Sequence, residues 1–180
     1  MRRGKLLITG MDIATSCGVA DGCPDSKPRV WTWRLSDYGK ARTDKLSALM
    51  RYCERYFADN RVDALFYERG LSLAAAMDIG MSDDTMALLR GAIGVVEACA
   101  ARAGVPRIEG VGVQEARRHL LGSGRIPRGQ GKAMVRERCR VLGWRTANDD
   151  ESDAAAIWSY GVGIISPMSS YRAMPLFAGQ

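Results

Sequence analysis

Carboxylates follow two apolar stretches of this chain and cluster again near its end. Asp12 follows the apolar residues 6–11, and Glu68 ends a similar stretch. Two further acids, Asp150 and Asp153, lie three residues apart, a spacing that puts both on one face of a helix. If the four side chains converge, their oxygens form the kind of ligand set that holds Mg²⁺ against a phosphate. The sequence therefore indicates a metal-dependent nuclease.

The position of these acids adds weight to that interpretation. An ionised carboxylate at the end of a buried strand must find a cation or take up a proton. The carboxyl ends of strands are also where α/β sheets commonly place ligand sites. One or two divalent cations would relieve the repulsion between four acids, activate a water and stabilise a leaving oxygen. For Asp150 and Glu151 alone, an acidic first turn favoured by the helix dipole explains the pattern equally well.

Composition narrows the class of partner. A chain of 180 residues with 47% hydrophobic content fits one domain with a sizeable core. Its formal charge of +6 favours polyanionic partners. Nine Lys or Arg residues lie between Arg117 and Arg145, against the single acid Glu137. A solvated helix face would also explain that basic segment.

Cysteine and histidine usage excludes several other classes. The five cysteines include no C-x-x-C pair, which favours reduced thiols in a cytoplasmic protein and argues against a zinc site. His119 is the only histidine, which excludes a histidine-rich metal site and argues against a Ser-His-Asp triad. The apolar run before Asp12 is too short for a signal peptide, and no stretch is long enough for a membrane span. We expect no membrane partner.

Periodicity and turn residues predict a mixed α/β fold. We expect strands at 6–12, 18–20, 30–35, 62–68 and 107–113, and helices at 45–57, 85–103, 114–121, 132–142 and 150–161. Residues 69–81 fit no regular element and are expected to be a mobile connection, and residues 122–131 a flexible basic loop. This order predicts a meander of antiparallel strands followed by parallel ones, with helices on both faces of the sheet.

Four short segments together resemble a known family. They are Gly-Met-Asp-Ile-Ala at 10–14, Gly-Val-Ala at 18–20, Tyr-Glu at 67–68 and Asp-Glu-Ser-Asp-Ala at 150–154. In this order they resemble the RuvC-type Holliday-junction resolvases of the RNase H-like superfamily, and the compact form is similar to phage members. The resemblance spans about residues 5–163. It implies a single nuclease domain over 1–180, with a five-stranded mixed sheet and a tail at 164–180.

The resemblance implies a catalytic and metal-binding role for Asp12, Glu68, Asp150 and Asp153, with Asp149 as an alternative to Asp150. It also implies Mg²⁺ as cofactor, at two ions per active site and with Mn²⁺ as a substitute. Water would attack the phosphodiester in line and leave a 5′-phosphate and a 3′-hydroxyl.

Further roles follow from the same resemblance. Lys132 is expected to be a catalytic cation beside the scissile phosphate, and Leu-Leu-Arg-Gly at 88–91 resembles a stretch that helps relatives dimerise. Relatives often carry an aromatic wedge just after the Glu of the second acidic segment, whereas this chain has Arg69 and Leu71 there, which we count among the DNA contacts. The remaining expected contacts to the DNA backbone are Arg117, Arg118, Arg125 and Arg128.

The leading hypothesis is a Mg²⁺-dependent endonuclease that acts as a homodimer and resolves four-way junctions or other branched DNA. A two-fold dimer would present two active sites to two symmetric strands. A second hypothesis is an RNase H-like nuclease that acts on RNA or on branched DNA less specifically. A nucleic-acid-binding module without cleavage is a third, and an unrelated α/β domain with exposed acids is a fourth.

Overall fold

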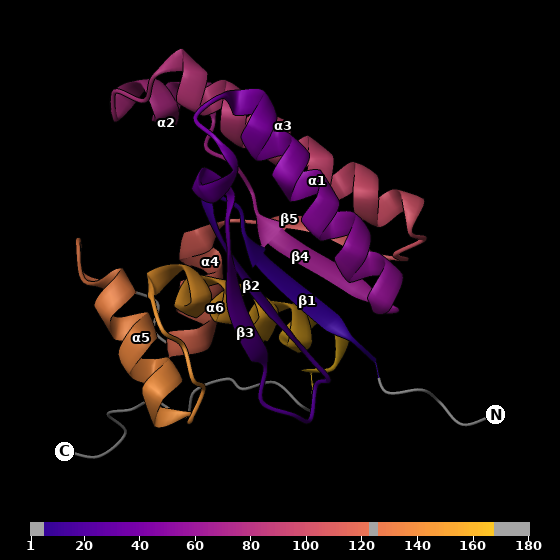
Figure 1. The fold of residues 1–180 in the computed structure, drawn as a ribbon. Helices are drawn as coiled ribbons and strands as arrows, with labels where there is room; N and C mark the ends of the chain where they lie inside the picture. The colour runs from indigo at the N-terminus through magenta and orange to yellow at the C-terminus, as the bar shows by residue number, and fades with distance from the viewer. Residues whose placement is uncertain (1–5, 123–125, 168–180) are drawn as a thin grey trace.

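The computed structural model describes residues 6–122 and 126–167 (Figure 1). The strands are β1 (Ile8–Asp12), β2 (Ser16–Gly22), β3 (Arg29–Arg34), β4 (Ala64–Glu68) and β5 (Ile108–Val111). The helices are the 3₁₀ turn η1 (Leu35–Tyr38), α1 (Arg42–Asp59), α2 (Leu73–Asp78), α3 (Asp83–Arg102), α4 (Val113–Leu121), α5 (Gly131–Val141) and α6 (Asp149–Ile165). None of the described helices is both long and apolar enough to cross a bilayer.

The strands form one mixed sheet in the order β3-β2-β1-β4-β5. β1, β2 and β3 make an antiparallel meander, whereas β4 pairs in parallel with β1, and β5 in parallel with β4. The sheet predicted from the sequence is therefore confirmed. Because Met11 is in register with Tyr67, the following residues Asp12 and Glu68 reach the same edge of the sheet side by side.

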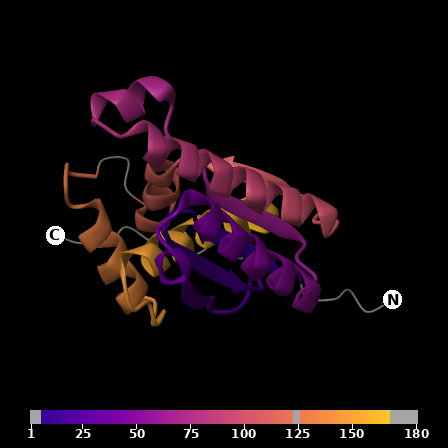
Figure 2. The same ribbon diagram turned by 45° about the horizontal axis from the view of Figure 1, so that its top comes forward.

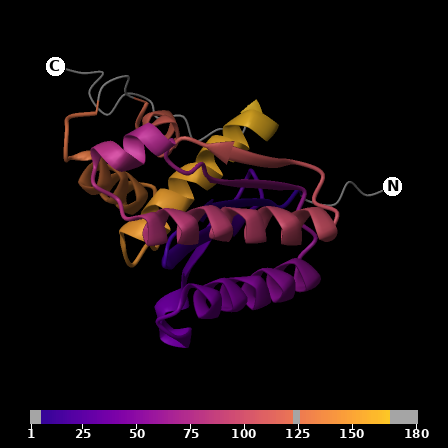
Figure 3. The same ribbon diagram turned by 90° about the horizontal axis from the view of Figure 1, so that it is seen from above.

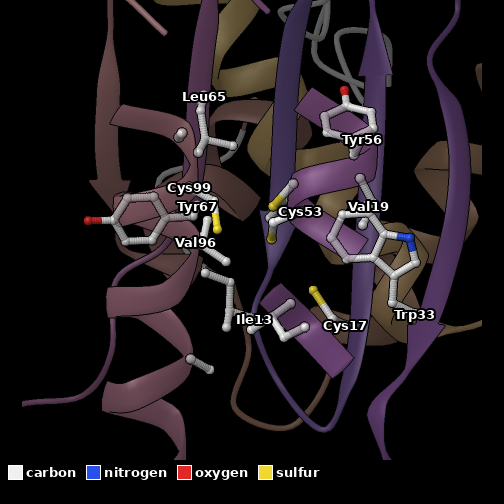
Figure 4. Close-up of a cluster of buried hydrophobic side chains, with 14 of the residues drawn as sticks. Ile13, Cys17, Val19, Trp33, Cys53, Tyr56, Leu65, Tyr67, Val96 and Cys99 are labelled. Atoms are coloured by element: carbon white, nitrogen blue, oxygen red, sulfur yellow. The ribbon is translucent and has the colours of Figure 1, made fainter. Parts of the chain in front are cut away.

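Helices cover both faces of the sheet, as Figure 3 shows from above. On one side α1 and α3 pack over Met11, Val19 and Leu65, in the cluster drawn in Figure 4. On the other side α4, α5 and α6 pack over Ile8 and Phe66. The two clusters use alternate residues of the same strands, because successive side chains of a strand point to opposite faces.

Helix α6 lies directly against the sheet because two strand positions carry no side chain. A Cβ atom at Gly10 would lie 2.4 Å from the backbone nitrogen of Trp158, and one at Gly18 would lie 2.1 Å from the carbonyl oxygen of Asp150. Contacts this short are with backbone, which cannot rotate away. The close approach brings the first turns of α6 to the edge where Asp12 lies.

We expect Gly18→Ala to destabilise the fold by more than about 3 kcal/mol, because the first turn of α6 must shift to admit the methyl group. Gly94→Ala in α3 is the control, since a Cβ there meets nothing within 4 Å. That change should stabilise the helix by about 0.5–1 kcal/mol. Urea unfolding of the two variants checks both values, and equal stabilities would contradict the seating of α6.

One prediction for the backbone was wrong. Residues 69–81 are not an irregular connection throughout, since they contain the helix α2, which projects from the body of the molecule beside the start of α3 (Figure 2). The side chain of Ser72 caps it by accepting a hydrogen bond from the backbone N–H of Ala75 at 3.2 Å. Three alanines favour the helix, and Gly80 follows it with φ of +68°. So short a helix has no room for a periodic pattern.

Candidate active site

The structure brings the four predicted acids towards one place. Asp12 ends β1 and Glu68 ends the adjacent β4, while Asp150 and Asp153 lie in the first turns of α6, which packs across β1. Asp12 and Asp153 are 7% and 3% exposed, and the other two are half-buried. Asp12, Glu68 and the pair in α6 are distant from one another in sequence, so only the fold explains their proximity.

The pKa of Asp12 reflects the proximity of the other three acids. Burial, a hydrogen bond with Glu68 and the negative charges of Glu68, Asp153 and Asp150 raise the pKa of Asp12 from 3.8 to about 9. Without a bound cation, Asp12 therefore retains a proton at neutral pH. Carboxylates under this mutual repulsion bind a divalent cation favourably.

We expect the metal-free protein to lose stability as the pH rises. Because the pKa of Asp12 is raised on folding, its contribution is fully present below pH 3.8 and is lost as the pH approaches about 9. Asp12→Asn is neutral at every pH, so its stability should fall less over the same range. Thermal unfolding of both proteins in chelator from about pH 5 to 9 measures the difference. Parallel stability curves would show that Asp12 ionises normally.

The remaining two acids have protein partners. Ser16 donates a hydrogen bond from Oγ to Oδ2 of Asp150 at 2.6 Å. Both oxygens of Asp153 accept hydrogen bonds from Arg117, at 2.8 Å from Nε and 2.6 Å from Nη2. Within the described residues, no three Asp, Glu, His or Cys side chains are arranged to hold a metal ion as they stand. The donor set nevertheless suits Mg²⁺, because it consists of carboxylate oxygens that carry excess negative charge.

Asp149 points to a different neighbour. Its carboxylate lies 3.5 Å from Nη1 of Arg136 and 4.0 Å from Nζ of Lys132, both on α5. Asp150, in contrast, contacts Ser16 on β2 and contributes to the raised pKa of Asp12. The geometry thus favours Asp150 over Asp149 as the third acid. It also places the exposed Lys132 beside the start of α6.

Most of the predicted contacts to DNA that the structure describes are exposed, whereas Arg117 is buried. Arg118 and Arg128 are exposed on α4 and before α5, and Arg69 is exposed just after β4. Leu71 is 49% exposed in the segment between β4 and α2. Arg125 lies outside the described residues. These positions leave the surface cations available to a polyanion.

Arg117 does not fit the prediction of a surface contact to phosphate. It is only 8% exposed, and its guanidinium is held by Asp153 rather than turned outward. The sequence contained a signal for this burial, since Arg117 shares the inward face of α4 with Leu120 and Leu121 at helical spacing. Sequence reasoning also missed Ser16, whose position opposite Arg34 in the β2–β3 pair gives no hint of its hydrogen bond with Asp150.

Comparison of whole structures identifies the fold. The RuvC structure from Thermus thermophilus matches with a TM-score of 0.63 at 18% identity, covering 93% of this chain and 99% of that one. RuvC from the same organism, in complex with a Holliday junction substrate, matches with a TM-score of 0.60 at 18% identity, covering 85% and 90%. The yeast mitochondrial Holliday junction resolvase Ydc2 matches with a TM-score of 0.53 at 12% identity, covering 90% and 82%.

These matches define an RNase H-like fold of the RuvC type over most of the chain. The resemblance predicted from four short segments is therefore confirmed at the level of the fold. No protein-family model and no curated relative matches the sequence. At such low identity the fold is shared, while the chemistry must be argued from the residues of this chain.

Proposed function

We propose that this chain is a Mg²⁺-dependent, structure-selective endonuclease that resolves four-way DNA junctions. The observation that supports this proposal most strongly is the gathering of Asp12, Glu68, Asp150 and Asp153 at one edge of a RuvC-type sheet. The T. thermophilus RuvC of the same fold was solved with a Holliday junction substrate. Four acids that would otherwise repel one another need a cation, and a phosphodiester is a substrate that needs the same cation.

Each acid has a distinct part in the proposal. Asp12 and Glu68, fixed at adjacent strand ends, would hold the metal from the side of the sheet, with two ions expected per site. Asp150 and Asp153 would complete it from α6, with Asp150 oriented by Ser16. Bound Mg²⁺ would activate a water and stabilise the leaving oxygen, with Mn²⁺ as a substitute. Burial of Asp12 keeps competing water away from its carboxylate.

The cations around this edge support a nucleic-acid substrate. Lys132 lies beside the start of α6 and is proposed to contact the scissile phosphate. Arg69, Arg118 and Arg128 are exposed and are proposed to hold flanking phosphates, which gives affinity with little base specificity. Leu71 is 49% exposed three residues after Glu68, and it is proposed to contact unstacked bases at a junction centre.

We also propose that residues 1–180 act as a single nuclease domain in a reducing, cytoplasmic compartment. All five cysteines are free thiols, and four of them are buried. Buried structural thiols without partners in a disulfide are typical of proteins kept in reducing conditions.

A homodimer is part of the proposal, because a junction offers two symmetric strands to two sites. The α2–α3 surface is suited to such a contact, since Leu89, Met81 and Met86 line an apolar groove and Ile79 is exposed beside it. We expect Leu89→Glu to shift the protein from dimer to monomer in sedimentation analysis. Its fold should remain, because Leu89 is only half-buried. A monomeric wild-type protein would remove dimerisation from the proposal.

A substrate panel tests the function itself. We expect purified protein with Mg²⁺ to cleave a four-way junction at symmetric positions and to leave linear duplex intact. Preference for an RNA–DNA hybrid or for single strands would instead indicate another RNase H-like nuclease. Junction binding without cleavage in Mg²⁺ or Mn²⁺ would indicate a binding module. Full activity in excess chelator would refute the metal-dependent mechanism.

A further inference from the structure

One cation is already present among the carboxylates. Arg117 reaches from α4 to α6 and meets Asp153 with two parallel hydrogen bonds, of 2.8 and 2.6 Å. A bidentate guanidinium–carboxylate pair is the strongest geometry for such an ion pair. Both partners are buried, so water does not compete with them. Asp153 therefore has both of its oxygens engaged by the protein itself.

The guanidinium of Arg117 also interacts electrostatically with Glu68 and Asp12. Its hydrogen bonds with Asp153, and the charges of Asp153, Glu68 and Asp12, raise the pKa of Arg117, whereas burial opposes this shift. The start of α5 covers the group from the other side, since a Cβ atom at Gly131 would lie 3.2 Å from Nη1 of Arg117. Arg117 therefore lies between the acids and the start of α5.

We propose that Arg117 is an internal counter-ion for Asp153 that a divalent cation must displace, and that it thereby sets the metal affinity of the carboxylate site. The inference rests on the proposed function, because it concerns the same four acids. Arg117 is a positioning residue in this scheme, since it acts through Asp153. It keeps the buried acids compatible with folding when no metal is bound.

The physical consequence is a competition for Asp153. A metal ion and a guanidinium compete for Asp153, because the bidentate pair occupies one lone pair on each oxygen and its positive charge repels a divalent cation. Binding of a metal therefore includes the free energy of separating a buried ion pair. Removal of Arg117 should weaken the metal-free fold and strengthen metal binding at the same time, because an unpaired buried carboxylate seeks a cation.

The direct test measures Mn²⁺ binding by isothermal titration calorimetry and the unfolding temperature with and without Mn²⁺. We expect Arg117→Met to bind Mn²⁺ about tenfold more tightly or better than wild type. Its unfolding temperature should be lower in chelator, and Mn²⁺ should raise it by more than in wild type. Arg117→Lys should fall between the two, because it retains a charge but loses the paired geometry.

Arg118→Met is the matched control. Arg118 is the next residue of the same helix, and it is exposed, with Nε donating to the backbone oxygen of Gln114 at 3.2 Å. Its loss removes the same charge and should leave Mn²⁺ affinity unchanged. Equal or weaker affinity in Arg117→Met, with Arg118→Met like wild type, would overturn the inference. Equal affinity would show that the ion pair does not compete with the metal, and weaker affinity would show that Arg117 holds Asp153 in a position that favours the metal.

A second measurement uses the wild-type protein and does not depend on a variant that folds. In chelator, the Nε–H of Arg117 should give an arginine side-chain NMR resonance that exchanges slowly with water. Saturating Mg²⁺ should shift this resonance and accelerate its exchange. A protected resonance that Mg²⁺ leaves unchanged would contradict displacement, even if Mg²⁺ binds. Absence of Mg²⁺ and Mn²⁺ binding in both wild type and Arg117→Met would instead refute the proposed function, and with it this inference.

Discussion

Asp12→Asn is expected to abolish junction cleavage while leaving junction binding intact. The change removes a charge and a strong ligand oxygen from the centre of the acid cluster, where Asp12 is hydrogen-bonded to Glu68. Several kcal/mol of transition-state stabilisation should be lost, so the cleavage rate should fall by a factor on the order of 10³ or more. The exposed cations proposed to hold phosphates are untouched, so the dissociation constant for junction DNA should change by less than about threefold.

Single-turnover cleavage and a gel-shift titration measure the two quantities on the same junction. Asp149→Asn is the matched control, because Asp149 opens the same helix as Asp150 but faces Lys132 and Arg136. It should retain most of the cleavage activity. Cleavage that survives Asp12→Asn would mean that the metal site has been assigned to the wrong residues. Loss of activity in Asp149→Asn alone would exchange the roles of the two neighbouring acids.

Asp150→Asn and Asp153→Asn should both lose cleavage, yet differ in stability. Asp153→Asn leaves the buried guanidinium of Arg117 without its ionic partner, which should lower the free energy of unfolding by about 3 kcal/mol. The loss should stay at the low end of the usual range, since Glu68 and Asp12 lie near the same guanidinium. Asp150→Asn can still accept the hydrogen bond from Ser16 and should change stability by less than about 1 kcal/mol.

Urea unfolding in chelator separates these two effects from catalysis. A double-mutant cycle between Asp153→Asn and Arg117→Met should show a favourable coupling, because the double variant leaves neither charge unpaired. Independent, additive losses would indicate that the two side chains do not interact in solution. Equal stability of Asp150→Asn and Asp153→Asn would also indicate that Arg117 and Asp153 do not interact in solution.

The acids and the sheet were accessible from the sequence for a common reason. Asp12 and Glu68 each end an apolar run, and an acid in that position is costly unless it has a role. The mixed sheet, with an antiparallel meander and then parallel strands, followed from the succession of elements along the chain, and it was confirmed. The apolar pattern of each strand agrees with its pairing in the sheet, so the sequence pattern was enough to predict the sheet.

Arg117 shows where that reasoning fails. A count of basic residues treats every arginine between 117 and 145 as a surface charge, although the inward face of α4 carries this one. Its partner lies 36 residues away on α6, a distance that no local pattern spans. The helix α2 failed for another reason, since a six-residue helix capped by Ser72 is too short to show periodicity.

The seating of α6 on Gly10 and Gly18 ties the carboxylate cluster to the contact between helix backbone and strand backbone. The acids of α6 cannot drift relative to Asp12 without separating helix backbone from strand backbone. The segments that would touch DNA, by contrast, are the connection after Glu68 and the stretch that precedes α5. Under the proposed function, substitutions and insertions there should change which branched substrates are accepted while the carboxylate site is preserved. Such a division would make the scaffold a practical starting point for nucleases with altered targets.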